Sequence, residues 1–257
     1  MSVITYLQGR ASEAVLSSTE IASINTSIST IKSRLSSHFG NGVSEQFRFG
    51  SSTRGTILPR SMDEHSDIDY MVVFSDSGYT PQTYLDRLKR FAEIYYSSSD
   101  IKQSSPSVVL QLNHIKFDLV PALKQSYVGY KIPNGPGAWQ ETNPNDFNAT
   151  LTAKNTAELS MIKPTIRLAK FWNASNGYIY DSYLLEKYIV GLSFPTALNQ
   201  RDYLFTTFDN LTLSYDQPQW RKDKLARAKD IIEKVRQLER DEMPHTAEGK
   251  VKKLIPE

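Results

Sequence analysis

The chain of 257 residues carries 30 basic and 28 acidic side chains, no cysteine and only short apolar runs. This length is enough for one large domain or two small ones with a buried core, whereas the lack of cysteine excludes thiol catalysis, iron–sulfur clusters and cysteine-ligated zinc. The near-neutral charge argues against a protein that coats nucleic acid, and the apolar runs fall far short of the about 20 residues that span a membrane. The N-terminal residues lack the basic stretch and apolar core of a secretory signal, so we expect a soluble cytoplasmic protein.

The first predicted element is a long helix over roughly 12–39. Its apolar residues recur at spacings of three and four, as on one helix face: Ile21, Ile24, Ile28, Ile31, Leu35 and Phe39. Ser17 and Glu20 fit a capping box at its start, and Gly40 fits its end.

Residues 46–123 are predicted to form a mixed α+β module with a small, largely antiparallel sheet. Short β-type runs occur at 46–49, 68–74, 107–112 and 115–120. The stretch between the second and third runs has helical spacing in Tyr84, Leu88, Phe91 and Tyr95. The turn of a hairpin between the last two strands is predicted at His114.

After this module, residues 125–150 are rich in proline, glycine and asparagine and are predicted to be an irregular crossing segment. Three helical stripes follow: Ile162 to Trp172, with Pro164 opening or kinking the helix, Tyr183 to Leu192, and Leu225 to Leu238. We therefore divide the chain into a lobe at 1–135, which includes the long N-terminal helix, and a helical lobe at 136–257.

Three aspartates point to chemistry. Asp67 and Asp69 share one face of a strand, while Ile68 points to the other. Two adjacent carboxylates repel each other, so either one takes up a proton or a cation lies between them. If the strand with Asp118 lies beside 67–74, the three acids converge, which suits a two-metal site for displacement at phosphorus. Each acid also has a structural interpretation, as a surface-turn residue or as the partner of an arginine.

The segment before these acids suits an anion. Gly50 lets the backbone approach a ligand, and Ser51 and Ser52 offer hydroxyl donors at a predicted helix start. Two serines before a helix are often only a cap. A glycine–serine pair, a D-x-D at a strand start and a later strand aspartate are together more specific than any of them alone.

Together these residues carry a resemblance. Gly50-Ser51, Asp67-x-Asp69 and Asp118 resemble the nucleotidyltransferases of the DNA polymerase beta superfamily. The segments 166–173 and 181–186 resemble the cyclic GMP-AMP synthase branch, which includes the bacterial CD-NTases of antiphage signalling (CBASS) systems. The crossing segment is also similar, through Tyr130, Ile132-Pro133, Trp139 and Asn143-Pro144. The resemblance covers about 46–190.

The resemblance implies a polymerase-beta-like lobe and an α-helical lobe with the active site in the cleft between them. Asp67, Asp69 and Asp118 would hold two Mg²⁺ ions, with Mn²⁺ as a substitute, and Asp118 would help activate a ribose hydroxyl. Ser51, with Gly50 and Ser52, would hold the terminal phosphates of a nucleoside triphosphate.

In the helical lobe, the resemblance implies that Lys170 and Ser182 reach the same triphosphate and that Tyr183 stacks on a base. Without the resemblance, Lys170 would be read as a solvated helix charge and Tyr183 as a core aromatic. Trp139 and Trp172 are predicted to be packing residues. Neither a cysteine-containing zinc insertion nor a strongly basic surface is present, so we expect neither activation by double-stranded DNA nor strong nucleic-acid binding.

The leading hypothesis is a nucleotidyltransferase that condenses ATP or other nucleoside triphosphates into a cyclic or short linear oligonucleotide messenger and releases pyrophosphate. Its product would be read by an effector protein, and a partner protein could activate it. The alternatives are template-independent transfer to an RNA 3′ end or to a protein, and an inactive nucleotide-binding scaffold.

Overall fold

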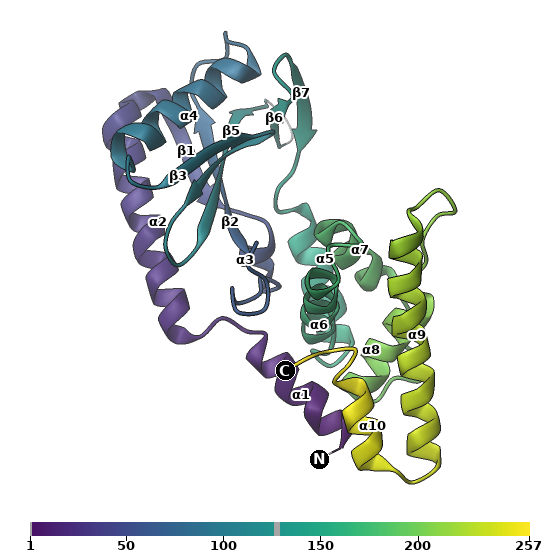
Figure 1. Cartoon of the computed structure of the whole chain (residues 1–257). Helices are drawn as coiled ribbons and strands as arrows, with labels where there is room; N and C mark the ends of the chain where they lie inside the picture. The colour runs from purple at the N-terminus through teal and green to yellow at the C-terminus, as the bar shows by residue number, and fades with distance from the viewer. Residues whose placement is uncertain (1, 126–128) are drawn as a thin grey trace. The chain divides into compact units, whose positions relative to one another are not determined.

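A computed structural model describes residues 2–125 and 129–257. The chain forms two compact units, and Figure 1 labels most of their elements. The helical unit comprises Met1–Val15, Ser61–Asp63 and Thr150–Glu257, and the sheet unit comprises Leu16–Arg60 and Glu64–Ala149.

The sheet unit contains the strands and three of the described helices. Its helices are α2 (Ser18–Phe39), the single turn α3 (Ser51–Arg54) and α4 (Pro81–Tyr95), and a 3-10 turn follows α2 at Gly40–Gly42. Its strands are β1 (Val43–Arg48), β2 (Asp67–Phe74), β3 (Asp100–Ser104), β4 (Ser107–Gln111), β5 (Lys116–Lys124), β6 (Tyr130–Asn134) and β7 (Ala138–Thr142). The predicted α+β class is confirmed.

The strands form one sheet in the order β1-β2-β5-β4-β3, with β6 paired to β5 and β7 paired to β6. β2 and β5 run parallel, and the other pairings are antiparallel. The predicted hairpin at His114 joins β4 to β5, and its ends are held by the bond from the Leu112 amide to the Ile115 carbonyl. The parallel pair places Asp69 directly opposite Asp118.

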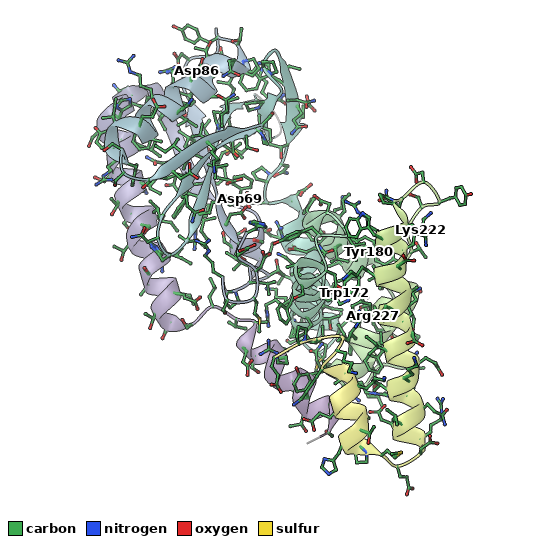
Figure 2. The ribbon with its side chains drawn as sticks, viewed as in Figure 1. Asp69, Asp86, Trp172, Tyr180, Lys222 and Arg227 are labelled. Carbon is green, nitrogen blue, oxygen red and sulfur yellow. The ribbon has the colours of Figure 1, made fainter. Side chains whose placement is uncertain are left out.

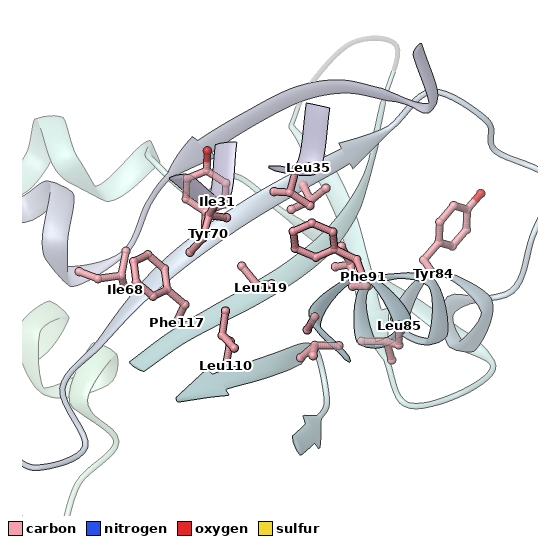
Figure 3. Packing of buried hydrophobic residues seen from close by; sticks show 14 of the residues in the cluster. Ile31, Leu35, Ile68, Tyr70, Tyr84, Leu85, Phe91, Leu110, Phe117 and Leu119 are labelled. Carbon is pink, nitrogen blue, oxygen red and sulfur yellow. The ribbon is translucent and has the colours of Figure 1, made fainter. Parts of the chain in front are cut away.

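The two faces of the sheet bury different amounts of apolar surface. On one face, alternate residues of β2 and β5 pack with α2 and α4 in the main core, which includes Ile31, Tyr70, Phe91 and Phe117 (Figure 3). On the other face a smaller cluster contains Met71, Val73, Val120, Ala122 and Ile132. Because side chains alternate along a strand, Asp67, Asp69 and Asp118 belong to this second, less crowded face.

The helical unit has its own core. Its elements are α1 (Val3–Glu13), most of α5 (Asp146–Ala157), α6 (Ile162–Ser175), α7 (Ser182–Gly191), α8 (Gln200–Asn210), α9 (Gln219–Arg240) and α10 (Pro244–Val251). Trp172 of α6 is buried edge-on against Phe208 of α8, as predicted for a packing residue. α1 packs against α6, α8 and α10, and the Tyr6 hydroxyl donates a 2.7 Å hydrogen bond to the Ile255 carbonyl.

The N-terminal helix differs from its prediction. Two helices, α1 and α2, replace the single helix expected over 12–39. The predicted capping box is present, since the Ser17 hydroxyl accepts from the Glu20 amide and the Glu20 carboxylate accepts from the Ser17 amide. A capping box ends the helix on its N-terminal side, so residues before Ser17 had to belong to another element.

The crossing segment at 125–150 is more regular than predicted. Within its described residues, 125 and 129–150, β6 and β7 form a hairpin and α5 begins at Asp146; the other part lies outside the described residues. The hairpin belongs to the sheet unit and α1 to the helical unit, so the compact units do not follow the expected division at residue 135.

Pro164 falls in the first turn of α6, where a proline costs no intrahelical hydrogen bond. In the part of the chain that the structure describes, no helix is long and apolar enough to cross a membrane.

Candidate active site

The acids of the site are positioned by the alternation of β2 and by its parallel pairing with β5. Asp67 and Asp69 are half-buried on one face, whereas Ile68 between them is fully buried on the other. Asp118 of β5 is the direct partner of Asp69 in the ladder. The sequence predicted that the three acids converge if the strand with Asp118 lies beside 67–74. The structure places these two strands side by side. Figure 2 labels Asp69 on its strand.

Asp118 lies in a more confined position than Asp67, since 22% of its side chain is exposed against 29% of that of Asp67. Its Oδ2 atom lies 3.3 Å from the Ser107 hydroxyl of β4. Its Oδ1 atom is buried and accepts no hydrogen bond from the described residues. Burial, reinforced by the negative charge of Asp67, raises the pKa of Asp118 to about 6, against the opposing effects of Lys116 and Ser107.

Lys116 is a site residue that the sequence reasoning missed. Its Nζ atom lies 3.1 Å from Asp67 Oδ2 and 3.9 Å from Asp118 Oδ1. Burial lowers the pKa of Lys116, but the carboxylates of Asp67 and Asp118 outweigh this effect and raise it overall. Its spacing in the sequence could have identified it, because a residue two positions before Asp118 lies on the same face of the strand.

The loop between β1 and α3 lies directly against Asp69. The Phe49 amide donates a 3.1 Å hydrogen bond to the Asp69 carbonyl, and Gly50 has a φ of +70°. A Cβ atom at Gly50 would lie 1.9 Å from Asp69 Oδ2. Glycine is thus required here for both backbone conformation and space, and it brings Ser51 close to the acids in the fold.

The two candidate phosphate-binding serines differ in their hydrogen bonds. The Ser52 hydroxyl donates to the Phe49 carbonyl at 3.1 Å. The Ser51 side chain, partly exposed at the first position of α3, makes no hydrogen bond to the described residues. Ser51 is therefore the better placed of the two to bind a ligand.

The other candidate residues lie on two helices of the helical unit. Lys170 of α6 is 7% exposed, and its Nζ atom donates a 3.1 Å hydrogen bond to Glu186 of α7, which is 1% exposed. Ser182 opens α7 behind the cap residue Asp181, whose carboxylate accepts from the Leu184 amide. Tyr183 is 39% exposed and has Lys187 near its ring. Lys170 is thus engaged in a buried ion pair rather than being a solvated charge.

The carboxylates do not form a closed cation cage. Among residues 2–125 and 129–257, no group of three or more histidines and acids is arranged to hold a metal. Lys116 lies between Asp67 and Asp118 instead. The arrangement provides oxygen ligands on one face, one buried oxygen to which no described residue donates a hydrogen bond, and a cation that compensates part of their charge.

Residues 1–155 match the model of the Second Messenger Oligonucleotide or Dinucleotide Synthetase (SMODS) domain. The chain belongs to the SMODS family. It is 27% identical to a probable cyclic nucleotide synthase of Bacillus cereus strain VD146, over 55% of this chain and 54% of that protein. The chain spans about half the length of the curated relatives that it matches.

Solved structures share the SMODS chain's fold over nearly its whole length. The CD-NTase CdnG of Bradyrhizobium diazoefficiens, in complex with GTP, has a TM-score of 0.72 at 12% identity, with 98% of each chain covered. CdnC of E. coli MS115-1, in a complex with HORMA-deltaN, has a TM-score of 0.70 at 18% identity, with 96% of each chain covered. The resemblance to CD-NTases and the polymerase-beta-like fold are confirmed.

Proposed function

We propose that this SMODS protein condenses nucleoside triphosphates into a cyclic or short linear oligonucleotide and releases pyrophosphate. The observation that carries the proposal is the placement of Asp67, Asp69 and Asp118 on one sheet face beside the Gly50 loop. The family supports it, as does a relative described as a cyclic nucleotide synthase. The GTP in the similar CdnG structure supports nucleoside triphosphates as substrates.

The three carboxylates fit a hard divalent cation. Mg²⁺ prefers oxygen ligands and usually retains water and substrate phosphates, and the buried Asp118 Oδ1 has no hydrogen bond within the described chain. Asp67, Asp69 and Asp118 would hold two Mg²⁺ ions, with Mn²⁺ as a substitute. When bound, such ions neutralise charge on the phosphates and on the attacking and leaving oxygens.

The protein contributes mainly orientation and charge. In the proposed reaction, the oxygen of an acceptor ribose hydroxyl forms a bond to the donor α-phosphorus, and the bond from that phosphorus to pyrophosphate breaks. Asp118 accepts the hydroxyl proton as the general base. Gly50 and Ser51, with Ser52, would orient the terminal phosphates of the donor.

Residues of the helical unit complete the proposal. Ser182 and Tyr183 lie at the start of α7, where Ser182 would contact the triphosphate and Tyr183 would stack on a base. Base stacking on an aromatic ring is worth about 1–3 kcal/mol and tolerates different bases. Lys170 would reach the triphosphate only by exchanging its contact with Glu186 for a phosphate.

We further propose that other proteins act with this one. The product would be read by an effector protein, as in antiphage signalling. The complex of the similar E. coli CdnC with HORMA-deltaN supports an activating protein partner.

The decisive test removes two carboxylates. The double variant Asp67→Asn, Asp69→Asn should reduce the rate of pyrophosphate release by about 100-fold or more. Circular dichroism and the thermal midpoint should show that the variant is folded. Turnover like that of the wild type in this double variant would refute the assignment of the site.

A second experiment separates the proposed reaction from transfer to a macromolecule. Purified protein is incubated with Mg²⁺ or Mn²⁺ and the four labelled triphosphates, without any added acceptor, and the products are identified by mass spectrometry. Oligonucleotide products are expected. Pyrophosphate release only after addition of RNA or a protein would support the alternative.

A further inference from the structure

We propose that Lys116 is an internal counter-ion that occupies the carboxylate site before metal binds, so that divalent cations bind strongly only together with a triphosphate. The inference rests on the proposed function, because it concerns the metal site of that reaction. It assigns a role to a residue that neither the motifs nor the family resemblance singled out.

The first argument is geometric. The register of the β2–β5 ladder places Lys116 opposite Asp67, and alternation places it on the same face as Asp118. Its ammonium group lies 3.1 Å from Asp67 Oδ2 and 3.9 Å from Asp118 Oδ1. One cation therefore contacts acids on two strands, at the position that a metal ion would have to enter.

The second argument is a comparison along the same strand. Lys124, at the far end of β5, also pairs with an acid, Glu45 of β1, but its side chain is 63% exposed. The side chain of Lys116 is 22% exposed, and those of Asp67 and Asp118 are 29% and 22% exposed. Charge interactions strengthen as water is excluded, so Lys116 compensates its acids much more effectively than Lys124 does.

The consequence concerns the order of binding. A lone divalent cation must displace the ammonium from Asp67 and Asp118, or enter beside it against like-charge repulsion. A triphosphate adds negative charge and its own oxygen ligands, which offsets this cost. The flexible four-carbon stem of lysine allows the ammonium to move aside without a change in the strand. Because coupling between two ligands is reciprocal, a bound divalent cation should strengthen triphosphate binding by the same factor.

The test measures Mn²⁺ binding directly, by electron paramagnetic resonance of free Mn²⁺, in protein without nucleotide. Lys116→Met keeps the length of the apolar stem and removes the charge. It should bind Mn²⁺ at least about tenfold more tightly than the wild type. An opposite charge within about 4–6 Å lowers the affinity of a carboxylate for a proton by one to three orders of magnitude, and Lys116 competes with Mn²⁺ for the same carboxylate charge. Lys116→Arg retains the charge and should remain weak.

Lys124→Met is the matched control. It removes the same charge from the same strand at an exposed ion pair, and its affinity for Mn²⁺ should equal that of the wild type. Equal tightening in Lys116→Met and Lys124→Met would show a general effect of net charge and would overturn the inference.

Thermal unfolding provides a second readout that does not depend on activity. Without Lys116 the acids repel one another, so Mn²⁺ should raise the thermal midpoint of Lys116→Met more than that of the wild type. Unchanged or weaker Mn²⁺ binding in Lys116→Met, or a variant that Mn²⁺ does not restore to a folded state, would overturn the inference.

A final arm separates this inference from the proposed function. Wild-type protein is titrated with Mn²⁺ in the presence of a non-hydrolysable ATP analogue. If Mn²⁺ bound strongly in the presence of the analogue, but bound nucleotide-free Lys116→Met no more tightly than the wild type, only the role of Lys116 would be refuted. The proposed function would stand. An absence of Mn²⁺ binding in every protein and condition would refute the metal site and the proposed function together.

Discussion

Gly50 has no side chain at a point where any other residue would collide with Asp69. Its φ of +70° disfavours other residues, and an added Cβ would lie 1.9 Å from the Asp69 carboxylate. Gly50→Ala should therefore displace Asp69 and reduce pyrophosphate release by about 100-fold, with a loss of unfolding free energy of about 1–3 kcal/mol. Steady-state kinetics and thermal unfolding measure the two effects.

Gly135→Ala separates backbone strain from collision. Gly135 has a similar φ of +77°, but no atom of the described residues beyond its chain neighbours lies within 4 Å of an added Cβ. This variant should lose a comparable amount of stability from strain and retain its activity. If both variants lost activity equally, the contact between Gly50 and Asp69 would not explain the effect.

The raised pKa of Asp118 means that this carboxyl group lowers the stability of the metal-free protein although the proposed reaction requires it. A carboxyl group whose pKa is about 6 when folded, against 3.8 ordinarily, binds its proton more tightly in the folded state. The contribution of Asp118 to folding stability in EDTA should therefore fall as the pH rises from about 4 to about 6. Asp118→Asn should remove this fall and stabilise the metal-free protein at pH 7.5 by about 3 kcal/mol, while abolishing pyrophosphate release.

Urea unfolding at pH 4 and at pH 7.5 measures this effect. Asp100→Asn, at an exposed ion pair on β3, is the control and should leave the pH dependence unchanged. A wild-type protein that gains stability between pH 4 and pH 6, with no effect of Asp118→Asn on that slope, would contradict the prediction.

At the scale of helices, the buried pair of Lys170 and Glu186 joins α6 to α7. Removing one partner of a buried ion pair is strongly destabilising. Lys170→Met should therefore lower the unfolding free energy by about 3 kcal/mol, and adding Glu186→Met should restore much of that loss. Chemical denaturation measures both. A Lys170 that served only to bind phosphate would leave stability unchanged and weaken nucleotide binding instead.

Elements with a regular spacing of apolar residues were predictable from the sequence. The more exposed hairpin of β6 and β7 was not. The stripe from Ile24 to Phe39 and the apolar run of β2 gave correct elements because one face of each packs into the main core. The hairpin of β6 and β7 was read as irregular because Pro133 and Gly135 are typical of loops. Proline is nevertheless tolerated in strands near a sheet edge.

The positions of the three site acids were also predictable from a sequence period, the alternation of side chains along a strand. The alternation of β2 and β5 fixes which side chains share a face, so Asp67, Asp69 and Asp118 needed only the pairing of two strands. The partner of Lys170 was not predictable, since Glu186 lies 16 residues away on another helix. Buried ion pairs depend on tertiary packing, which a local pattern does not contain.

At the scale of the whole molecule, the charge balance bears on the choice of substrate. With a net charge of +2, the protein lacks the excess of cations that holds a polynucleotide. A protein that contacts six to ten nucleic-acid phosphates loses about 10³–10⁵ in affinity between 50 and 200 mM salt. We expect pyrophosphate release from free triphosphates to change by less than about tenfold over this range.

The same assay with added double-stranded DNA or RNA gives the comparison. Neither polymer should increase the rate at either salt concentration. A large stimulation at 50 mM salt that disappears at 200 mM would show that a polynucleotide is an activator or acceptor.

The path of the chain through the two units has a consequence for its synthesis. The first helix, with buried Val3 and Leu7, finds its partners in α6, α8 and α10, and Tyr6 bonds to Ile255. Domains generally fold as units while the ribosome is still extending the chain. The sheet can thus assemble early. The apolar residues of α1 remain exposed, and need chaperones to protect them, until Ile255 emerges 249 positions after Tyr6.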